Sequence, residues 1–215
     1  NPQGMFADSE TLKNLVRLAR SYDFLLVSDE CYSEIYHREP PGGAAAACAA
    51  LGGGLANVAI VNSLSKRSSA PGLRSGFVAG EAGFIRKFTR LRDYGAVAPP
   101  LPLLAAATAL WSEETHVEAN RVLYRQKYDA AESILGNRFG FYRPPGGFYL
   151  WLDVGDGEAA ARTLWREAGV RVVPGAYFAR PDKDGHNPGA AYIRCALVQD
   201  VTTTRQALER LAAAL

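Results

Sequence analysis

Apolar residues recur along the first part of the chain with two spacings, one typical of helices and one typical of buried strands. The helical spacing predicts a helix from about Ser9 to Ser21, with Asp8 as its N-cap. Residues 24–27, Phe-Leu-Leu-Val, form a dense apolar run that predicts a strand buried on both faces. Two more short strands are predicted at residues 58–61 and 76–80. Acidic residues follow the first strand, and a lysine follows the second.

The remaining pattern predicts further helices and strands. The predicted helices are residues 81–94, 103–111, 114–135, 158–168 and the segment from Asp200 to Leu215, and the predicted strands are residues 148–152, 170–173 and 192–198. Residues 40–55 are rich in alanine and glycine and predict a loop with one short helix. Helices that alternate with short buried strands indicate an α/β fold, with a mixed, mostly parallel sheet between helices. Composition shifts after the long helix, so we expect a larger domain at 1–135 and a small α+β domain at 136–215.

Composition narrows the classes of function. The 215 residues are 48% apolar and 21% charged, with a formal net charge of +2, and the arginines are scattered among acids. We therefore expect no nucleic-acid partner. No apolar run is long enough to cross a bilayer and no signal sequence opens the chain, so we expect no membrane partner and a cytoplasmic location. The three cysteines lack paired short spacing, which favours reduced thiols over disulfides or a zinc site, and we predict no metal.

The stretch from Ser63 to Gly80 contains the most informative chemistry. Lys66 follows the strand at 58–61, and ligands of open α/β sheets bind where strands end. Ser63, Ser65 and Arg74 could hold an anion beside the amine, since Pro71-Gly72 supplies a bend. A lysine beside a phosphate site suggests Schiff-base chemistry. Taken in isolation, the stretch fits a basic surface loop equally well.

Several polar features elsewhere match this stretch in order and spacing. They are N-P-x-G at residues 1–4, D-E-x-Y at 29–32, S-x-S-K at 63–66, an arginine eight residues after the lysine, and Y-I-R at 192–194, whose last residue is Arg194. Each alone has an ordinary explanation as a turn, a cap, a core residue or a surface charge. Together they resemble the fold-type I, class I/II aminotransferases, which use pyridoxal phosphate. The strings around Lys66 and at residues 28–36 and 147–152 are most similar to the succinyldiaminopimelate aminotransferases of bacterial lysine biosynthesis.

The resemblance implies catalytic roles for three residues. Lys66 is expected to form the Schiff base with pyridoxal phosphate and to move the proton at the substrate α-carbon. Asp29 is expected to keep the pyridine nitrogen protonated. Tyr32 and Asn1 are expected to donate hydrogen bonds to the phenolic oxygen of the cofactor. Asn1 is also expected to lie in the substrate site.

The resemblance further implies binding roles. Ser63, Ser65 and Arg74 are expected to hold the cofactor phosphate, and Arg194 to bind the substrate α-carboxylate. The implied reaction is amino transfer from glutamate to a keto or aldehyde acid, with N-succinyl-2-amino-6-oxopimelate as the expected acceptor, in a homodimer. Four arginines are possible contacts for a second substrate carboxylate: Arg67, Arg92, Arg138 and Arg171.

The same residues leave other interpretations open. An aminotransferase with another acceptor, or a fold-type I β-lyase, would use the same lysine and aspartate. A non-catalytic, cofactor-binding regulatory domain is a third possibility. The chain starts at Asn1 without methionine, so we expect a C-terminal piece of such an enzyme. Gln3 also departs from the family, which often has threonine there.

Overall fold

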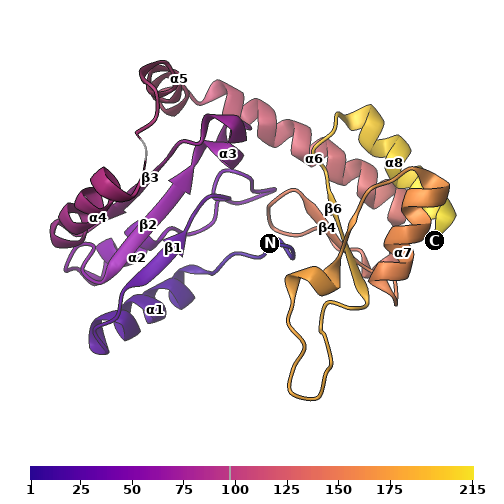
Figure 1. Ribbon diagram of the computed structural model, residues 1–215, viewed down its shortest axis with the longest axis horizontal. Helices are drawn as coiled ribbons and strands as arrows, with labels where there is room; N and C mark the ends of the chain where they lie inside the picture. Colours follow the sequence, from indigo (N-terminus) through magenta and orange to yellow (C-terminus); the bar gives the residue numbers. More distant parts are fainter. Residues whose placement is uncertain (97) are drawn as a thin grey trace. The chain divides into compact units, whose positions relative to one another are not determined.

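The structure of this protein is a computed structural model that describes residues 1–96 and 98–215. Contacts divide the chain into two compact units, which are described separately (Figure 1). Unit 1 comprises Asn1–Met5 and Val122–Leu215, and unit 2 comprises Phe6–Arg121. The division falls inside the long helix α6, Thr115–Leu135. The sequence predicted two domains, 1–135 and 136–215, with their boundary at the end of that helix. This division stays a prediction.

Unit 2 contains a three-stranded mixed sheet. Its strands are β1 (Leu26–Asp29), β2 (Val58–Ser63) and β3 (Gly76–Gly80), in the order β1-β2-β3. β1 and β2 are parallel, and β2 and β3 are antiparallel. Helices on this sheet make the unit α/β, as the sequence predicted (Figure 1). The parallel register pairs Asp29 with Val61, so β1 and β2 end at the same edge of the sheet.

Two helices form the core of unit 2 with β2. Helix α1 (Ser9–Ser21) has the predicted limits, and the Asp8 side chain accepts a hydrogen bond from the Thr11 amide at 2.7 Å. The short helix expected within residues 40–55 is α2 (Ala44–Leu51). Their apolar faces meet the strands in one buried cluster, made of Leu12, Val16, Ala44, Ala47, Cys48, Val58 and Ile60.

The prediction of a first strand buried on both faces is wrong for the described chain. The ladder starts at Leu26, whose amide donates to the Asn57 carbonyl, because the chain turns at Asp23 with φ of 52°. β1 lies at an edge of the described sheet of unit 2, and its residues alternate between partly buried and exposed because successive side chains face opposite sides of the sheet. Val27 is 56% exposed, and Phe24 and Leu25 are more than 40% exposed.

The segment that carries Lys66 is more regular than the predicted loop. A single helical turn, α3 (Leu64–Arg67), follows β2 directly, and a 3-10 turn, Pro71–Leu73, precedes β3. After β3 come α4 (Ala82–Gly95) and α5 (Leu101–Trp111). α5 begins two residues before its predicted start, because a proline is tolerated in the first turn of a helix.

Unit 1 is a small α+β unit. Its antiparallel sheet has the order β4-β6-β5, with β4 at Tyr149–Asp153, β5 at Val173–Pro174 and β6 at Tyr192–Ala196. The predicted helix at 158–168 is α7 (Gly157–Thr163), continued by a π-helical turn, Leu164–Ala168. Helix α8 (Val201–Ala214) has Asp200 as its N-cap. Tyr128, at 0% exposure, lies in the core, and its hydroxyl donates to the Tyr149 carbonyl at 2.7 Å.

Hydrogen bonds to backbone carbonyls connect the N-terminal turn to the rest of unit 1. The Gly146 amide donates to the Gly4 carbonyl at 3.2 Å, and the Tyr142 hydroxyl donates to the Gln3 carbonyl at 2.8 Å. Gly4 has φ of 71°, and a Cβ there would lie 2.4 Å from the Gly146 oxygen. The glycine of the N-P-x-G motif is therefore required both by its backbone conformation and by this close approach.

Among the residues that the structure describes, no helix is both long and apolar enough to span a bilayer.

Replacing Gly4 by alanine tests this close approach. Gly136, which has φ of 56° and open space around its Cα, is the matched control. We expect Gly136→Ala to lower the free energy of unfolding by about 1 kcal/mol, through the positive φ alone. Gly4→Ala should lose about 1–3 kcal/mol more, because its methyl group overlaps the Gly146 oxygen. Urea denaturation of both variants measures the difference, and equal losses would contradict the steric argument.

Candidate functional site

Lys66 lies on the one-turn helix α3, directly after β2. The Ser63 side chain caps this turn by accepting a hydrogen bond from the Ser65 amide at 3.1 Å. The Ser63 hydroxyl also lies within hydrogen-bond distance of the Ser75 carbonyl, at 3.2 Å, which joins the cap to the segment before β3. Lys66 is partly buried, and its Nζ lies 5.8 Å from the centre of the Tyr32 ring. The structure therefore brings the predicted lysine and tyrosine together.

Asp29 and Cys31 lie beside the same lysine. Asp29 ends β1, and its carboxylate accepts a hydrogen bond from the Cys31 amide at 3.0 Å. Burial, followed by the hydrogen bond and charge of Asp29, raises the pKa of the Cys31 thiol to about 12, while the charge of Lys66 acts in the opposite direction. Cys31 is therefore a neutral thiol between a carboxylate and an amine, and it is unsuited to act as a nucleophile.

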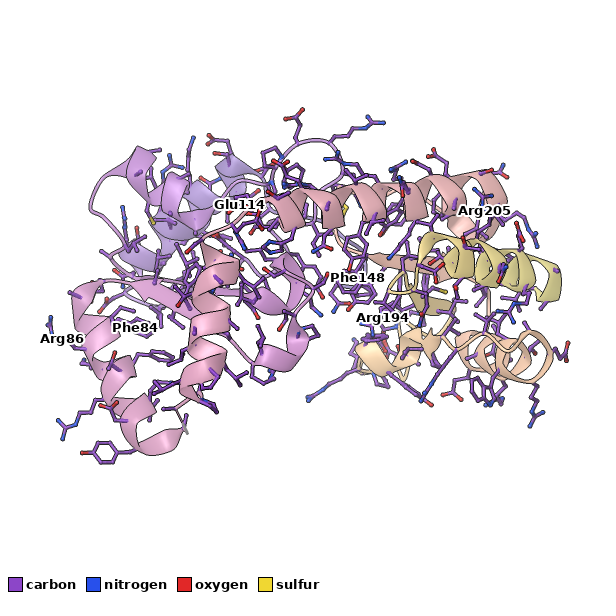
Figure 2. All side chains as sticks on the ribbon, turned by 90° about the horizontal axis from the view of Figure 1, so that it is seen from above. Phe84, Arg86, Glu114, Phe148, Arg194 and Arg205 are labelled. Carbon is purple, nitrogen blue, oxygen red and sulfur yellow. The ribbon has the colours of Figure 1, made fainter. Side chains whose placement is uncertain are left out.

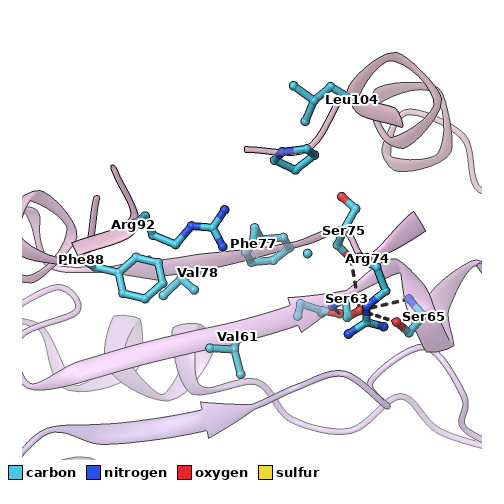
Figure 3. Close-up of a pocket in the computed structure, with 13 residues that line it drawn as sticks. Val61, Ser63, Ser65, Arg74, Ser75, Phe77, Val78, Phe88, Arg92 and Leu104 are labelled. Carbon is cyan, nitrogen blue, oxygen red and sulfur yellow. Dashed lines mark hydrogen bonds between the residues drawn. The ribbon is translucent and has the colours of Figure 1, made fainter. Parts of the chain in front are cut away.

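A pocket of about 520 Å³ opens beside Ser63 and Ser65 (Figure 3). Arg74 lines it from the turn before β3, in a left-handed conformation with φ of 51°. Its Nη1 donates to the Pro71 carbonyl at 3.1 Å, so the predicted Pro71-Gly72 bend positions this arginine. Arg92, on α4, lines the same pocket. The sequence left Arg92 unplaced, because no local pattern indicates which wall of a pocket a helix will form.

Arg194 and Asn1 form a second group of predicted site residues, in unit 1. The Arg194 Nη1 donates to the Asn1 side-chain oxygen at 2.9 Å. Its guanidinium carbon lies 4.3 Å from the ring centre of Tyr149 and 4.2 Å from that of Phe178. The Tyr149 ring in turn contacts Phe148 at 4.5 Å between ring centres; Figure 2 labels Phe148 and Arg194. Two aromatic faces thus hold the guanidinium plane.

Arg194 is partly buried, and its Nε keeps unused hydrogen-bonding capacity. This Nε is buried and has no hydrogen-bond partner among the residues that the structure describes. A buried donor without an acceptor is costly, and a water, an ion or a ligand could each supply the acceptor. A carboxylate matches the planar fork of a guanidinium.

The arginines considered for a second carboxylate have different surroundings. Arg67 is 5% exposed, and its guanidinium is bonded to protein groups, which removes it as a substrate contact. Arg138 lies over the Phe139 ring at 4.7 Å, and Arg171 is exposed.

Comparisons of the chain with a family model, with curated proteins and with solved structures all identify aminotransferases as similar. The family model described as aminotransferase class I and II matches residues 1–211. A curated transaminase of Streptomyces rimosus, OxyQ, which acts on 4-dedimethylamino-4-oxo-anhydrotetracycline, is 31% identical over 91% of this chain and 53% of its own length. The crystal structure of an aminotransferase from Neisseria meningitidis has 42% identity and a TM-score of 0.90, over 99% of this chain and 55% of that one.

A third similar structure is described as a probable N-succinyldiaminopimelate aminotransferase from Thermus thermophilus. It has a TM-score of 0.83 over 100% of this chain and 56% of that one, and its identity of 24% supports the fold alone. The chain spans about half the length of the curated relatives it matches.

The side chains present fit pyridoxal phosphate, the cofactor of this family. Three serines and two arginines are among the residues that line the pocket, and hydroxyl and guanidinium groups are suited to bind a phosphate. The Lys66 amine and the Asp29 carboxylate follow neighbouring parallel strands, which is the place where α/β sheets bind ligands. The described residues thus include a group of suitable chemistry for the phosphate, the aldehyde and the ring nitrogen of the cofactor. Lys66, Asp29 and Tyr32 are not among the residues that line the pocket beside Ser63.

The raised pKa of Cys31 predicts a slow thiol. With a pKa of about 12, roughly one molecule in ten thousand is thiolate at pH 8, so iodoacetamide should alkylate Cys31 slowly in the cofactor-free, full-length protein. Asp29→Asn should speed alkylation of Cys31, because it removes a negative charge that favours the neutral thiol. Peptide mass spectrometry measures both rates, with Cys48 as the internal control. Rapid alkylation of Cys31 in the unmodified protein would contradict this account.

Proposed function

This chain belongs to the family of class I and II aminotransferases, and we propose that the protein transfers an amino group from glutamate to a keto or aldehyde acid. The observation that carries the proposal is the grouping of Lys66 with Tyr32 and Asp29 where β1 and β2 end. We propose N-succinyl-2-amino-6-oxopimelate as the acceptor, from the strings shared with succinyldiaminopimelate aminotransferases. The homodimer and the cytoplasmic location stay predictions.

Each proposed role follows from the chemistry of the side chain. Bound pyridoxal phosphate supplies an electron sink for the electron pair that is released at the substrate α-carbon. Asp29, a carboxylate at the end of a strand, would hold a proton on the ring nitrogen through its negative charge. Ser63, Ser65 and Arg74 would bind the phosphate with two hydroxyls and a guanidinium.

Lys66 would act as both the attachment point and the general base. Its Nζ would hold the aldehyde group of the cofactor in the absence of substrate, and the amine, once free of the cofactor, would take the proton from the substrate α-carbon. Tyr32, whose ring lies 5.8 Å from this Nζ, would donate its hydroxyl proton to the phenolic oxygen. Arg67 and two serines follow Lys66 on the chain, and none of these three residues carries a second primary amine.

Arg194 would orient the amino acid. Its guanidinium is held between Tyr149 and Phe178, so an α-carboxylate would meet a fork whose plane is already set. The partnerless Nε and the contact with Asn1 support this role. The second substrate carboxylate is unassigned, and Arg67 is excluded from that role.

A spectroscopic experiment on the full-length protein tests amino transfer. Glutamate alone should bleach the visible band of the lysine-bound cofactor, and a keto acceptor should restore it. Lys66→Ala should lower amino transfer by about 10³-fold or more, because it removes the base and the attachment point. Lys183→Ala, which changes an exposed lysine in unit 1, is the control and should leave the rate unchanged. A band that glutamate does not move would overturn the proposal.

A second assay tests the acceptor. With glutamate as donor, the succinylated amino-oxopimelate should have a kcat/KM about tenfold or more above that of its acetylated analogue, because a site built for a second carboxylate discriminates against its absence. Steady-state kinetics of both acceptors measure the ratio. An equal or reversed preference would reject the succinylated acceptor and leave amino transfer itself in place.

A further inference from the structure

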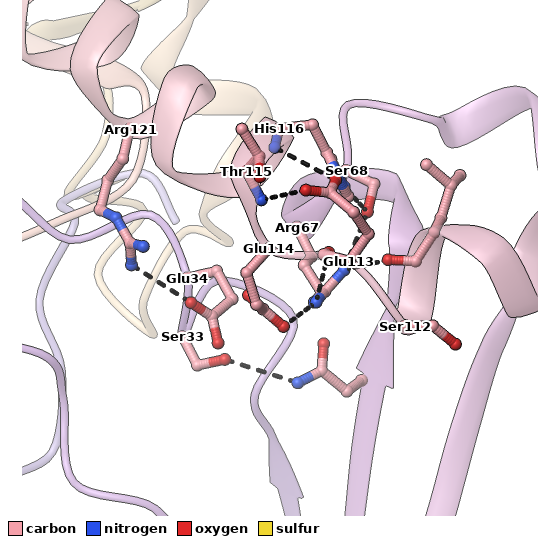
Figure 4. Close-up of polar contacts among 12 residues, drawn as sticks. Ser33, Glu34, Arg67, Ser68, Ser112, Glu113, Glu114, Thr115, His116 and Arg121 are labelled. Carbon is pink, nitrogen blue, oxygen red and sulfur yellow. Dashed lines mark hydrogen bonds and ion pairs between the residues drawn. The ribbon is translucent and has the colours of Figure 1, made fainter.

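The residue after Lys66 is a buried arginine with a full set of partners. Arg67 is 5% exposed and forms an ion pair with Glu114 (Figure 4). Its Nη1 donates to the Leu110 carbonyl at 2.6 Å, and its Nη2 to the Glu113 carbonyl at 3.3 Å. A buried charge is tolerated only where hydrogen bonds compensate its desolvation, and here the two carbonyls and the carboxylate lie at the junction of α5 and α6.

An aromatic contact strengthens the same attachment. The guanidinium carbon of Arg67 lies 5.1 Å from the ring centre of Trp111, the last residue of α5. Trp111 packs against Phe77 of β3, with 5.2 Å between ring centres. The Arg67 side chain thus connects the turn that carries Lys66 to α5, and through Trp111 to the neighbouring strand.

Ser68 supplies a second, independent link to the same junction. The Ser68 hydroxyl lies 2.8 Å from His116 Nε2, and His116 Nδ1 lies 2.6 Å from the Glu113 carboxylate (Figure 4). The carboxylate of Glu113 also accepts a hydrogen bond from the Thr115 amide at the start of α6. Two consecutive residues after Lys66 are therefore tied to residues 110–116.

The chain Ser68–His116–Glu113 has the connectivity of a nucleophilic triad, but its surroundings do not fit that role. Ser68 is 9% exposed, and it is not among the residues that line the pocket beside Ser63. Arg67 Nη1 additionally donates to the Ser68 oxygen at 3.3 Å. The hydroxyl is held by two side chains in a buried place, which indicates a structural link.

These links matter because α3 cannot hold its own position. It is four residues long, and an isolated helical turn is unstable in water. The position of the long, flexible Lys66 side chain depends on the position of the backbone of this turn. Catalysis by a positioned base is sensitive to displacements of about 1 Å, which can cost about 10²-fold in rate.

We propose that Arg67, supported by the Ser68–His116–Glu113 chain, is a positioning residue that holds α3 so that the Lys66 amine stays beside Tyr32 and Asp29. The inference rests on the proposed function for its catalytic consequence. The position of the amine itself is a property of the protein without cofactor, and it can be measured separately.

The test compares Arg67→Met with Arg67→Lys in the full-length protein, and Arg162→Met is the control. Arg162 is exposed on α7 and forms an ion pair with Glu158, and its replacement by methionine changes the net charge by the same amount. The first readout is the pH dependence of trinitrobenzenesulfonate labelling of Lys66 in cofactor-free protein, followed by peptide mass spectrometry. The second is the pH midpoint of the visible band with pyridoxal phosphate bound, together with kcat and KM.

Arg67→Met should raise the labelling rate of Lys66 several-fold, shift the spectroscopic midpoint and lower kcat by about 10–100-fold, with KM for glutamate nearly unchanged. Arg67→Lys should recover part of each change, because it restores the charge beside Glu114 without the planar fork. Arg162→Met should match the unmodified protein in all readouts. If Arg67→Met does not fold, His116→Ala, which breaks only the second link, is judged by the same criteria.

Unchanged labelling and an unchanged midpoint in a folded Arg67→Met protein would overturn the inference, even if its melting temperature falls. Failure of the proposed function gives a different result. In that case the unmodified protein shows no response to glutamate, whereas the labelling of Lys66 still reports whether Arg67 holds the amine.

Discussion

The parallel pairing of β1 with β2 is the constraint on which the candidate chemistry depends. Parallel strands end at the same edge of a sheet, and the register places Asp29 opposite Val61, two residues before Ser63. A carboxylate and an amine from segments 37 positions apart in the numbering therefore emerge close together. The antiparallel β3 then returns the chain, so that Ser75 contacts Ser63 and Arg74 reaches the pocket beside it.

The buried Arg67 and the partly buried Arg194 show how surroundings decide the role of the same side chain. Arg67 is surrounded by carbonyls, a carboxylate and an indole ring, so its hydrogen-bonding capacity is used within the protein. Arg194 is held by two aromatic faces and one amide, and its buried Nε has no acceptor within the described part of the chain. Aromatic faces fix the plane of a guanidinium without using its N–H groups. The first arginine is therefore suited to hold structure and the second to bind an anion.

The sequence predicted the elements whose signals are local. Helix α1 has the expected limits because a capping aspartate and an apolar stripe act within four residues of each other. The motif residues Lys66, Tyr32 and Asp29 were identified through the family resemblance, and the structure places them near one another. Local patterns failed for β1, where an apolar run predicted burial on both faces, because the exposure of a strand depends on its neighbours in the sheet.

The sequence alone determined the chemistry that this chain can offer: a lysine, an acid, a hydroxyl pair and two arginines in a recognisable order. Only the tertiary structure decided which of these groups have capacity left for a ligand. Arg67 forms an ion pair with Glu114, and Arg92 lines the pocket. Arg194 donates a hydrogen bond to Asn1, which is 193 positions away in the sequence. The physical reason is that residue type sets what a side chain can bond, whereas burial and long-range neighbours set what it has already bonded.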